Sequence, residues 1–263
     1  MSEVRVLVIG AGGRMGREVV RAVTEAEDMV LVGAVDRSRV GEDAGRVAGL
    51  EPASVIITDS LSDAIGASSP DVAVDFTLPS AVMGNVRTAL RSGVACVVGA
   101  SGVTEKDCSE LERLCHERKR PVLVAPNFAI GAVLMMQFAA QAARHMEAAE
   151  IIELHHAGKA DAPSGTALRT AQLMSSATGS RLAGQQSSDG RPSRGQGEGA
   201  IHIHSVRLPG LVAHQEVIFG GWGETLTIRH DSTSRESFMP GVLLAIRKVR
   251  GLRGLVVGLE KIL

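Results

Sequence analysis

Apolar runs alternate with amphipathic stretches along the first half of the chain. Val4–Ile9 is mostly apolar and β-branched, which is typical of a strand buried on both faces of a parallel sheet. Further strands are expected at 30–36, 71–76, 94–99 and 122–125. Helices are expected between them, one of which begins at Pro79 and ends at Gly93. Repeated strand–helix units predict an α/β fold with a Rossmann-type, doubly wound parallel sheet.

The pattern changes near Asn127. The second half predicts helices at 129–145 and 164–176, and strands at 149–155, 201–207, 213–219 and 224–230. Consecutive strands with little helix between them predict a second, α+β mixed-sheet domain. Residues 178–199 are rich in Gly, Ser, Gln and Arg and are expected to form a long mobile loop. Ser234 is expected to cap a last helix at 238–250, before a short strand at 255–258.

Composition excludes several kinds of partner. The chain has 263 residues, which suits two modest domains or one large one, and its net charge of −1 favours neither nucleic acid nor an anionic membrane. Aromatic residues make up only 2 %, too few for base-stacking platforms. No stretch approaches the roughly 18 apolar residues of a membrane span, and the N-terminus is unlike a signal peptide. Three cysteines, expected to be reduced, fit a cytoplasmic protein.

A glycine-rich turn follows the first predicted strand. It consists of Gly10, Ala11, Gly12, Gly13, Arg14, Met15 and Gly16. Glycines there permit a tight turn and a close approach of the backbone to a pyrophosphate, and the helix N-terminus supplies N–H groups and partial positive charge. The motif is a variant of G-x-G-x-x-G, because Met15 occupies the last glycine position and Gly16 follows it.

The end of the second predicted strand bears on the choice of cofactor. Asp36 lies twenty residues after Gly16, where a carboxylate accepts hydrogen bonds from the adenosine ribose. The adjacent Arg37 suits a 2′-phosphate, so we expect use of both NADH and NADPH. The loops Gly99, Ala100 and Ser101, and Ala125, Pro126, Asn127 and Phe128, follow strands of the same sheet and are expected to contact the nicotinamide half.

The densest group of reactive residues extends from Glu153 to Ala167. It contains His155, His156, Lys159 and Asp161, and it ends with Ser164, Gly165 and Thr166 at a predicted helix start. Histidine and lysine side chains supply protons, while N–H groups at the helix start hold a carboxylate. The alternative is a polar surface loop before a capped helix. No metal is expected, because the run lacks a third soft ligand, and His202 and His204 are expected on a half-buried sheet face.

These residues closely resemble the 4-hydroxy-tetrahydrodipicolinate (dihydrodipicolinate) reductase family. The family pattern His-His-x-x-Lys-x-Asp-Ala-Pro-Ser-Gly-Thr-Ala matches 155–167 without departure, and Gly-x-Gly-Gly-Arg-Met-Gly matches 10–16. The positions Asp75, Phe76 and Thr77 and the C-terminal pattern around 217–220 and 237–238 are also similar to the family. The resemblance covers essentially the whole chain.

The resemblance implies reduction of a small cyclic dicarboxylate, with loss of water, in the diaminopimelate pathway of lysine biosynthesis. It implies a dinucleotide-binding domain of residues 1–127 plus 233–263, and a substrate-binding and tetramerisation domain of residues 128–232. His155 and Lys159 would supply protons. His156, Ser164, Gly165 and Thr166 would bind the substrate, and the residues named above in the glycine turn, after the second strand and in the two later loops would bind NADH or NADPH. A homotetramer is implied.

Two positions depart from the family pattern. Asp36 stands where the family often has Glu, which bears on cofactor preference, and Gly99-Ala100-Ser101-Gly102 replaces a common Gly-Thr-Thr-Gly, which removes one hydroxyl. Two other functions stay open from the residues alone. One is another small-substrate dehydrogenase of the same architecture, which would not need the histidine–lysine loop. The other is a non-catalytic dinucleotide sensor, which would tolerate loss of His155 and Lys159.

Overall fold

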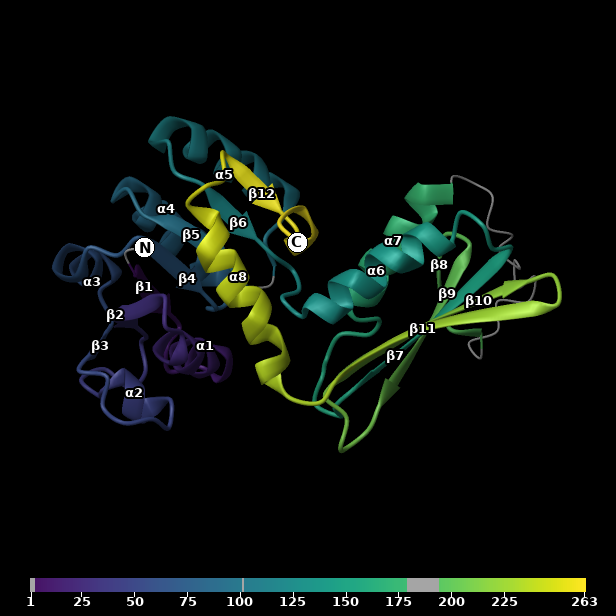
Figure 1. The fold of residues 1–263 in the computed structure, drawn as a ribbon, viewed down its shortest axis with the longest axis horizontal. Helices are drawn as coiled ribbons and strands as arrows, with labels where there is room; N and C mark the ends of the chain where they lie inside the picture. Colours follow the sequence, from purple (N-terminus) through teal and green to yellow (C-terminus); the bar gives the residue numbers. More distant parts are fainter. Residues whose placement is uncertain (1–2, 101, 179–193) are drawn as a thin grey trace. The chain divides into compact units, whose positions relative to one another are not determined.

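The computed structural model describes residues 3–100, 102–178 and 194–263. The chain divides into two compact units, one of residues 1–128 and 238–263 and the other of residues 129–237 (Figure 1). The sequence placed these boundaries after residues 127 and 232. Each unit is described by itself.

A seven-stranded, wholly parallel sheet forms the first unit, as the sequence predicted. Its order is β12-β6-β5-β4-β1-β2-β3, which contains the 3-2-1-4-5-6 order of a dinucleotide-binding sheet. The strands are β1 Val4–Ile9, β2 Met29–Val35, β3 Ile57–Thr58, β4 Val72–Asp75, β5 Ala95–Val98, β6 Val122–Val124 and β12 Leu255–Val257. The predicted C-terminal strand is therefore confirmed, and its partner is β6.

Helices cover both faces of this sheet (Figure 1). They are α1 Arg14–Glu25, α2 Ala44–Val47, α3 Leu61–Ser68, α4 Pro79–Arg91, α5 Glu105–Arg118 and α8 Met239–Val249. At the start of α5, Thr104 and Asp107 form a reciprocal capping box. The expected capping of α8 by Ser234 is wrong. Ser234 instead accepts a hydrogen bond from the Glu236 N–H in the 3₁₀ turn Arg235–Phe238, and α8 begins only after that turn.

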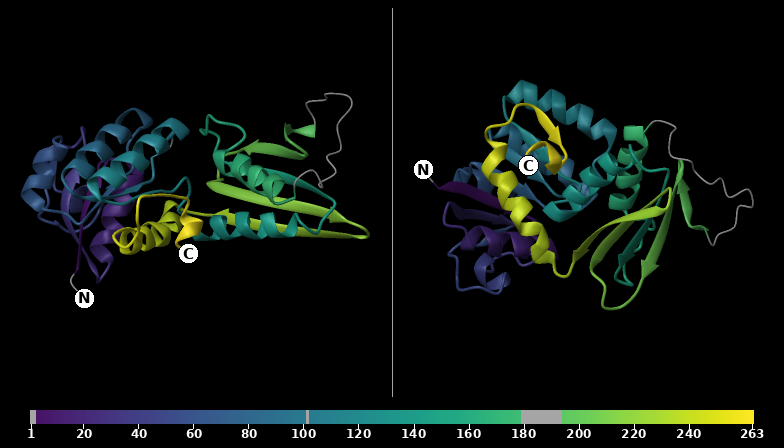
Figure 2. Two further views of the ribbon diagram at one scale, coloured as in Figure 1. Left: turned by 90° about the horizontal axis from the view of Figure 1, so that it is seen from above. Right: turned by 45° about the vertical axis from the view of Figure 1, so that its right-hand side comes forward.

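The second unit is built on a mixed five-stranded sheet of order β11-β10-β7-β9-β8. Its strands are β7 Ala148–His155, β8 Gln196–Glu198, β9 Ile201–Arg207, β10 Ala213–Gly221 and β11 Glu224–Ser232, and only β7 and β9 are parallel neighbours. The helices α6 Ile130–Ala142 and α7 Gly165–Thr178 pack against each other and against this sheet (Figure 2). Buried side chains such as Ile151, Ile203 and Phe219 form the core beneath them.

The prediction of a loop at 178–199 is wrong at the C-terminal end of that range, which the structure describes. Gln196–Glu198 forms edge strand β8, paired with β9. Such a three-residue strand carries no periodic signal of its own, so only its partner reveals it. Residues 179–193 of that predicted loop lie outside the described residues. Within the described part of the chain, no helix is both long and apolar enough to cross a membrane.

Candidate active site

The glycine turn packs α1 directly under the end of β1. Gly10 has a φ of +84°, and the Gly13 N–H donates to the Gly10 carbonyl oxygen at 3.0 Å. A Cβ on Gly16 would lie 1.9 Å from that same oxygen, so position 16 admits no side chain. This explains the variant spacing, because Gly16 provides the close contact between strand and helix that the strict motif assigns to its last glycine. At the start of α1, the N–H groups of Arg14 and Met15 have no acceptor among the described residues.

Asp36 lies beside this turn. Its Oδ2 accepts the Gly12 N–H at 2.8 Å, and its Oδ1 accepts the Ser38 N–H at 2.8 Å and the Ser38 hydroxyl at 2.7 Å. The carboxylate is therefore held in place and retains a lone pair for a further donor. Arg37 is exposed, and its side chain makes no hydrogen bond or ion pair with any described residue. Both groups follow the end of β2, where the sequence predicts contacts with a nucleotide.

The loops after β4, β5 and β6 lie at the same edge of the sheet. Ala125 and Phe128 are buried there, Asn127 is half-buried, and Pro126 is exposed. Gly99 packs on Phe76 so closely that a Cβ would lie 2.2 Å from the ring, and the Phe76 and Phe128 rings are 5.6 Å apart between centroids. Ala100 is buried and Ser101 lies outside the described residues.

A buried carboxylate, Asp75, lies at the end of β4, and no catalytic or binding role was predicted for it. Asp75 accepts the Thr77 N–H at 2.7 Å, the Thr77 hydroxyl at 2.6 Å and the Asn85 amide at 2.9 Å. Burial raises the pKa of Asp75, and these three hydrogen bonds oppose that shift. The network ties the loop after β4 to helix α4. Asn85 could not be identified from the sequence because it lies ten residues away on a helix.

The second group of reactive residues begins at the end of β7. The His155 imidazole Nδ1 donates to Glu153 Oε2 at 2.5 Å, which leaves Nε2 without a partner among the described residues. Glu153 is fully buried and also accepts two hydrogen bonds from the Arg207 guanidinium, at 2.7 and 2.8 Å. Burial alone would raise the pKa of Glu153, but hydrogen bonds led by those from His155 and Arg207 outweigh it and bring the pKa to about 2.

The loop after β7 presents the remaining predicted residues. Lys159 Nζ donates to both carboxylate oxygens of Asp161, at 2.7 and 2.8 Å. The Ser164 hydroxyl accepts the Ala167 N–H at 3.2 Å and so caps α7. Gly165, at the first position of α7, is exposed, and its N–H has no acceptor among the described residues. A helix start of this kind suits an anionic group.

The structure thus gathers the predicted residues into two groups, one in each unit. His155, His156, Lys159, Ser164, Gly165 and Thr166 share the segment between β7 and α7 of the second unit, and the predicted nucleotide contacts lie at the strand ends of the first unit. Sequence reasoning assigned no role to Glu153 and missed Arg207. Arg207 is found only from the parallel register that pairs it with His155, and that register joins positions 52 residues apart in the chain.

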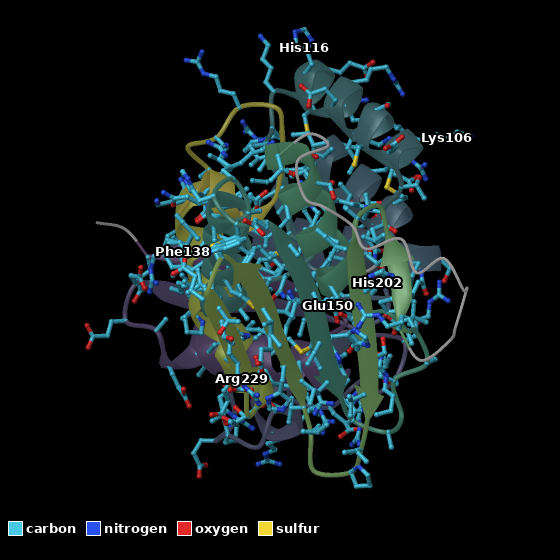
Figure 3. The ribbon with its side chains drawn as sticks, turned by 90° about the vertical axis from the view of Figure 1, so that its right-hand side faces the viewer. Lys106, His116, Phe138, Glu150, His202 and Arg229 are labelled. Atoms are coloured by element: carbon cyan, nitrogen blue, oxygen red, sulfur yellow. The ribbon has the colours of Figure 1, made fainter. Side chains whose placement is uncertain are left out.

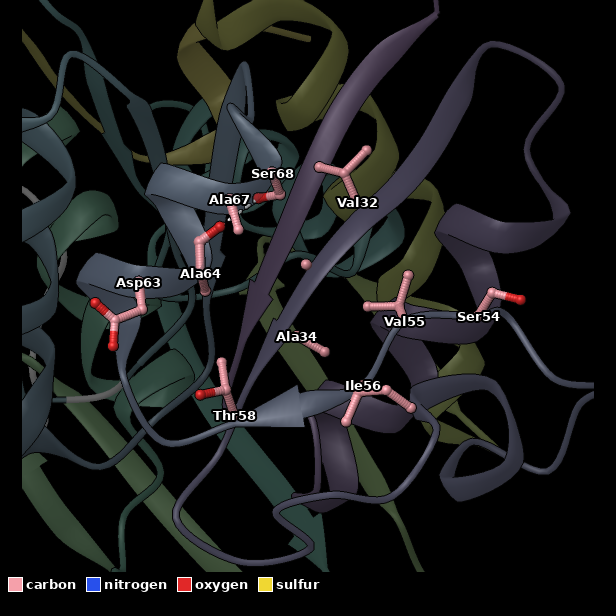
Figure 4. Close-up of a pocket in the computed structure, with 11 residues that line it drawn as sticks. Val32, Ala34, Ser54, Val55, Ile56, Thr58, Asp63, Ala64, Ala67 and Ser68 are labelled. Atoms are coloured by element: carbon pink, nitrogen blue, oxygen red, sulfur yellow. Dashed lines mark hydrogen bonds between the residues drawn. The ribbon is translucent and has the colours of Figure 1, made fainter.

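Two other features lie away from these groups. His204 on β9 donates to Glu150 on the neighbouring strand β7 at 2.7 Å. His202 also lies on β9, where it pairs with Glu150 in the sheet (Figure 3). No group of three or more His, Cys, Asp or Glu side chains suited to a metal ion occurs among the described residues. A hollow of about 340 Å³ lies between β2, the 54–58 segment and α3 (Figure 4), and no predicted site residue lines it.

Comparisons with known proteins agree along the whole chain. Residues 4–128 match the family model of the dihydrodipicolinate reductase N-terminus, and residues 131–263 match that of the C-terminus. The 4-hydroxy-tetrahydrodipicolinate reductase of Moorella thermoacetica is 52 % identical, with 100 % of this chain and 99 % of the relative covered. That of Desulfitobacterium hafniense (strain DSM 10664 / DCB-2) is 50 % identical, with 100 % of both covered.

Solved structures give the same result. A dihydrodipicolinate reductase from Paenisporosarcina sp. TG-14, solved with dipicolinate bound, is 42 % identical and superposes with a TM-score of 0.85, covering 99 % of this chain and 100 % of that one. An amine dehydrogenase from Mycobacterium smegmatis, only 14 % identical, shares the fold with a TM-score of 0.73 over 100 % of this chain and 96 % of its own. This chain belongs to the dihydrodipicolinate reductase family.

Proposed function

We propose that this chain reduces 4-hydroxy-tetrahydrodipicolinate to tetrahydrodipicolinate, with loss of water, at the expense of NADH or NADPH. This step belongs to the diaminopimelate pathway of lysine biosynthesis. The observation that carries the proposal is the β7–α7 segment. There His155 and Lys159 are each held by a carboxylate, and the segment ends at a helix start whose Gly165 N–H has no acceptor among the described residues. The names of the full-length relatives support it.

The first unit fits a nicotinamide dinucleotide. The turn at Gly10 and Gly16 has no room for side chains, so backbone N–H groups can approach a pyrophosphate. Gly10 to Met15 would hold that pyrophosphate, Asp36 the ribose and Arg37 a 2′-phosphate. The loops Gly99–Ser101 and Ala125–Phe128 would contact the nicotinamide half. When bound, the reduced nicotinamide supplies a hydride.

The second unit supplies binding and proton transfer. His156, Ser164, Gly165 and Thr166 would bind the substrate carboxylates, since the start of α7 combines backbone N–H groups with partial positive charge. Departure of the hydroxyl as water takes up one proton and releases one from the ring, and addition of hydride takes up another, so the net consumption is one proton. His155 is suited to give it through Nε2, because Nδ1 is engaged by Glu153. The Lys159 ammonium is the second donor, placed to protonate or hold the leaving hydroxyl.

Dipicolinate binding in the Paenisporosarcina enzyme supports a planar dicarboxylate as the ligand class.

We further propose a homotetramer in the cytoplasm, assembled through the second unit, with neither nucleic acid nor membrane as partner. Size-exclusion chromatography with light scattering tests the assembly. A monomer at micromolar concentration would contradict it.

The activity is tested by following the absorbance of NADH and of NADPH with freshly made product of the upstream synthase. Oxidation that depends on this product is expected with both cofactors. Oxidation of neither, by protein that binds dipicolinate and gains thermal stability from NADH, would contradict the assigned reaction. If the protein responds to neither ligand, the preparation rather than the assignment has failed.

A further inference from the structure

We propose that the buried Glu153–Arg207 pair is the positioning pair of this site, fixing both proton-donating side chains at once. The inference rests on the proposed function. It concerns two residues that touch neither cofactor nor substrate in the mechanism above. They act through His155 and Lys159.

Glu153 is saturated by donors. Its Oε2 accepts from His155 Nδ1 at 2.5 Å and from Arg207 Nη1 at 2.8 Å, and its Oε1 accepts from Arg207 Nη2 at 2.7 Å and from the Ser164 N–H at 3.2 Å. The carboxylate thus contacts His155, the last residue of β7, and Ser164, which caps α7, and these two residues flank the reactive loop 156–163. Both ends of the loop 156–163 are anchored on one buried side chain.

Arg207 extends this connection to Lys159. Its Nη2 also donates to the Asp161 carbonyl oxygen at 2.7 Å, and the Asp161 carboxylate binds the Lys159 ammonium. The β9 strand brings Arg207 there, because its register places Arg207 opposite His155. The chain of contacts therefore runs from His155 through Glu153, Arg207 and Asp161 to Lys159. A carboxylate that holds the Nδ1–H of a histidine fixes its tautomer and ring orientation, so that Nε2 exchanges the proton.

A purely structural role would not require an ion pair at this position. Buried ion pairs can often be replaced by apolar side chains without loss of stability, so stability alone does not require this pair. All four acceptor sites are filled by His155 and Ser164, which flank the reactive loop, and by Arg207 on the partner strand, and this points instead to the placement of the loop.

Glu153→Gln is the discriminating variant. Glutamine has one oxygen and one NH₂ group, so in either orientation its NH₂ meets two of the four donors. We expect kcat to fall roughly 10- to 100-fold, within the range of general acid–base contributions. The Kd for dipicolinate, measured by calorimetry, should change less than about threefold, because the carboxylate-binding groups at the start of α7 remain. The basic limb of the kcat–pH profile should move to lower pH, since the negative charge that stabilises a protonated imidazole is lost.

The charged groups joined to His155 in this chain of contacts are Glu153 from β7 itself, Arg207 from β9, and Asp161 and Lys159 from the loop. Within the part of the chain that the structure describes, Glu153 is the charged group that hydrogen-bonds to the imidazole, so the shift in Glu153→Gln reports on this contact. Glu150→Gln is the matched control. Glu150 lies on the same strand and likewise accepts from a histidine, His204, and an arginine, Arg194. No hydrogen bond between described residues joins it to the reactive loop.

Glu153→Gln leaves the Arg207 charge unpaired and thus lowers stability. The double variant Glu153→Met with Arg207→Met removes both charges and keeps the measurement possible if the single variant does not fold. It should show the same loss of kcat with dipicolinate binding retained. Wild-type kcat per folded molecule with an unshifted pH profile in either variant would overturn the inference and leave the proposed function intact. Parallel loss of dipicolinate binding would also overturn it, since the site would then have collapsed.

Discussion

The carbonyl oxygen of Gly10 leaves no space for a side chain on Gly16. A Cβ added to Gly16 would lie 1.9 Å from that oxygen and 2.6 Å from its carbon. Both neighbours are backbone atoms at the end of β1, so they cannot move without displacing the strand. The contact connects the sequence motif to the fold, because it fixes where α1 begins relative to the expected pyrophosphate.

Gly16→Ala should therefore damage both stability and nucleotide binding. We expect the free energy of unfolding to fall by about 1–3 kcal/mol, as for other overpacked positions. NADH and NADPH should no longer raise the melting temperature. Gly66→Ala is the control, because its Cβ would meet nothing within 4 Å in helix α3. That change should stabilise the protein by roughly 0.5–1 kcal/mol, and equal ligand-induced shifts in both variants would contradict this account.

Arg37→Ala should separate the two cofactors. The exposed guanidinium has no partner among the described residues, and we propose that it binds the 2′-phosphate. We expect KM for NADPH to rise about tenfold, in line with the loss of a charged hydrogen bond of roughly 1.5 kcal/mol, while KM for NADH stays unchanged. Arg39→Ala is the comparison, since Arg39 pairs with Glu42 at 3.4 Å. A uniform rise for both cofactors would remove Arg37 from cofactor selection.

Stability should depend on pH through Glu153. Its pKa is lowered from 4.5 to about 2 in the folded chain. A carboxyl group with a depressed folded-state pKa contributes stability above its unfolded pKa and loses it as pH falls through the folded value. Urea unfolding should therefore show a difference between wild type and Glu153→Gln on the order of 3 kcal/mol at pH 7. This difference should shrink steadily below about pH 4.5, and a pH-independent difference would refute the assignment.

Lys159→Gln tests the second proton donor. The ammonium is held by Asp161 at 2.7 and 2.8 Å, and the side chain is 22 % exposed. Loss of a positioned proton donor should lower kcat roughly 10²- to 10⁴-fold. Lys106→Gln, on the exposed surface of α5, should behave as wild type. Comparable kcat values for the two variants would exclude Lys159 from the chemistry.

Much of the first unit follows from local signals. Buried strands of a parallel sheet are nearly continuous apolar runs, and Pro79 and Gly93 mark the two ends of a helix, so these elements were predicted close to their bounds. The short elements α2, β3 and α3 were not predicted. They span four, two and eight residues, which is too short for a reliable period.

The residues of the candidate site also divide into those visible from local sequence and those brought together by tertiary structure. The residues from His155 to Thr166 are adjacent in sequence, so their chemistry is visible in one segment. Arg207 joins them only through the β7–β9 register, and Asn85 reaches Asp75 only through the packing of α4. Such contacts depend on which strands and helices pack together. A single sequence does not reveal them, because it does not specify the partner strand or its register.

The most direct test compares wild type with the His155→Ala, Lys159→Ala double variant in the same assay, using freshly made product of the upstream synthase and either NADH or NADPH. The account predicts rapid substrate-dependent oxidation by wild type and almost none by the double variant, with both proteins still stabilised by NADH. Equal rates for the two proteins, or no substrate-dependent oxidation by wild type, would contradict it.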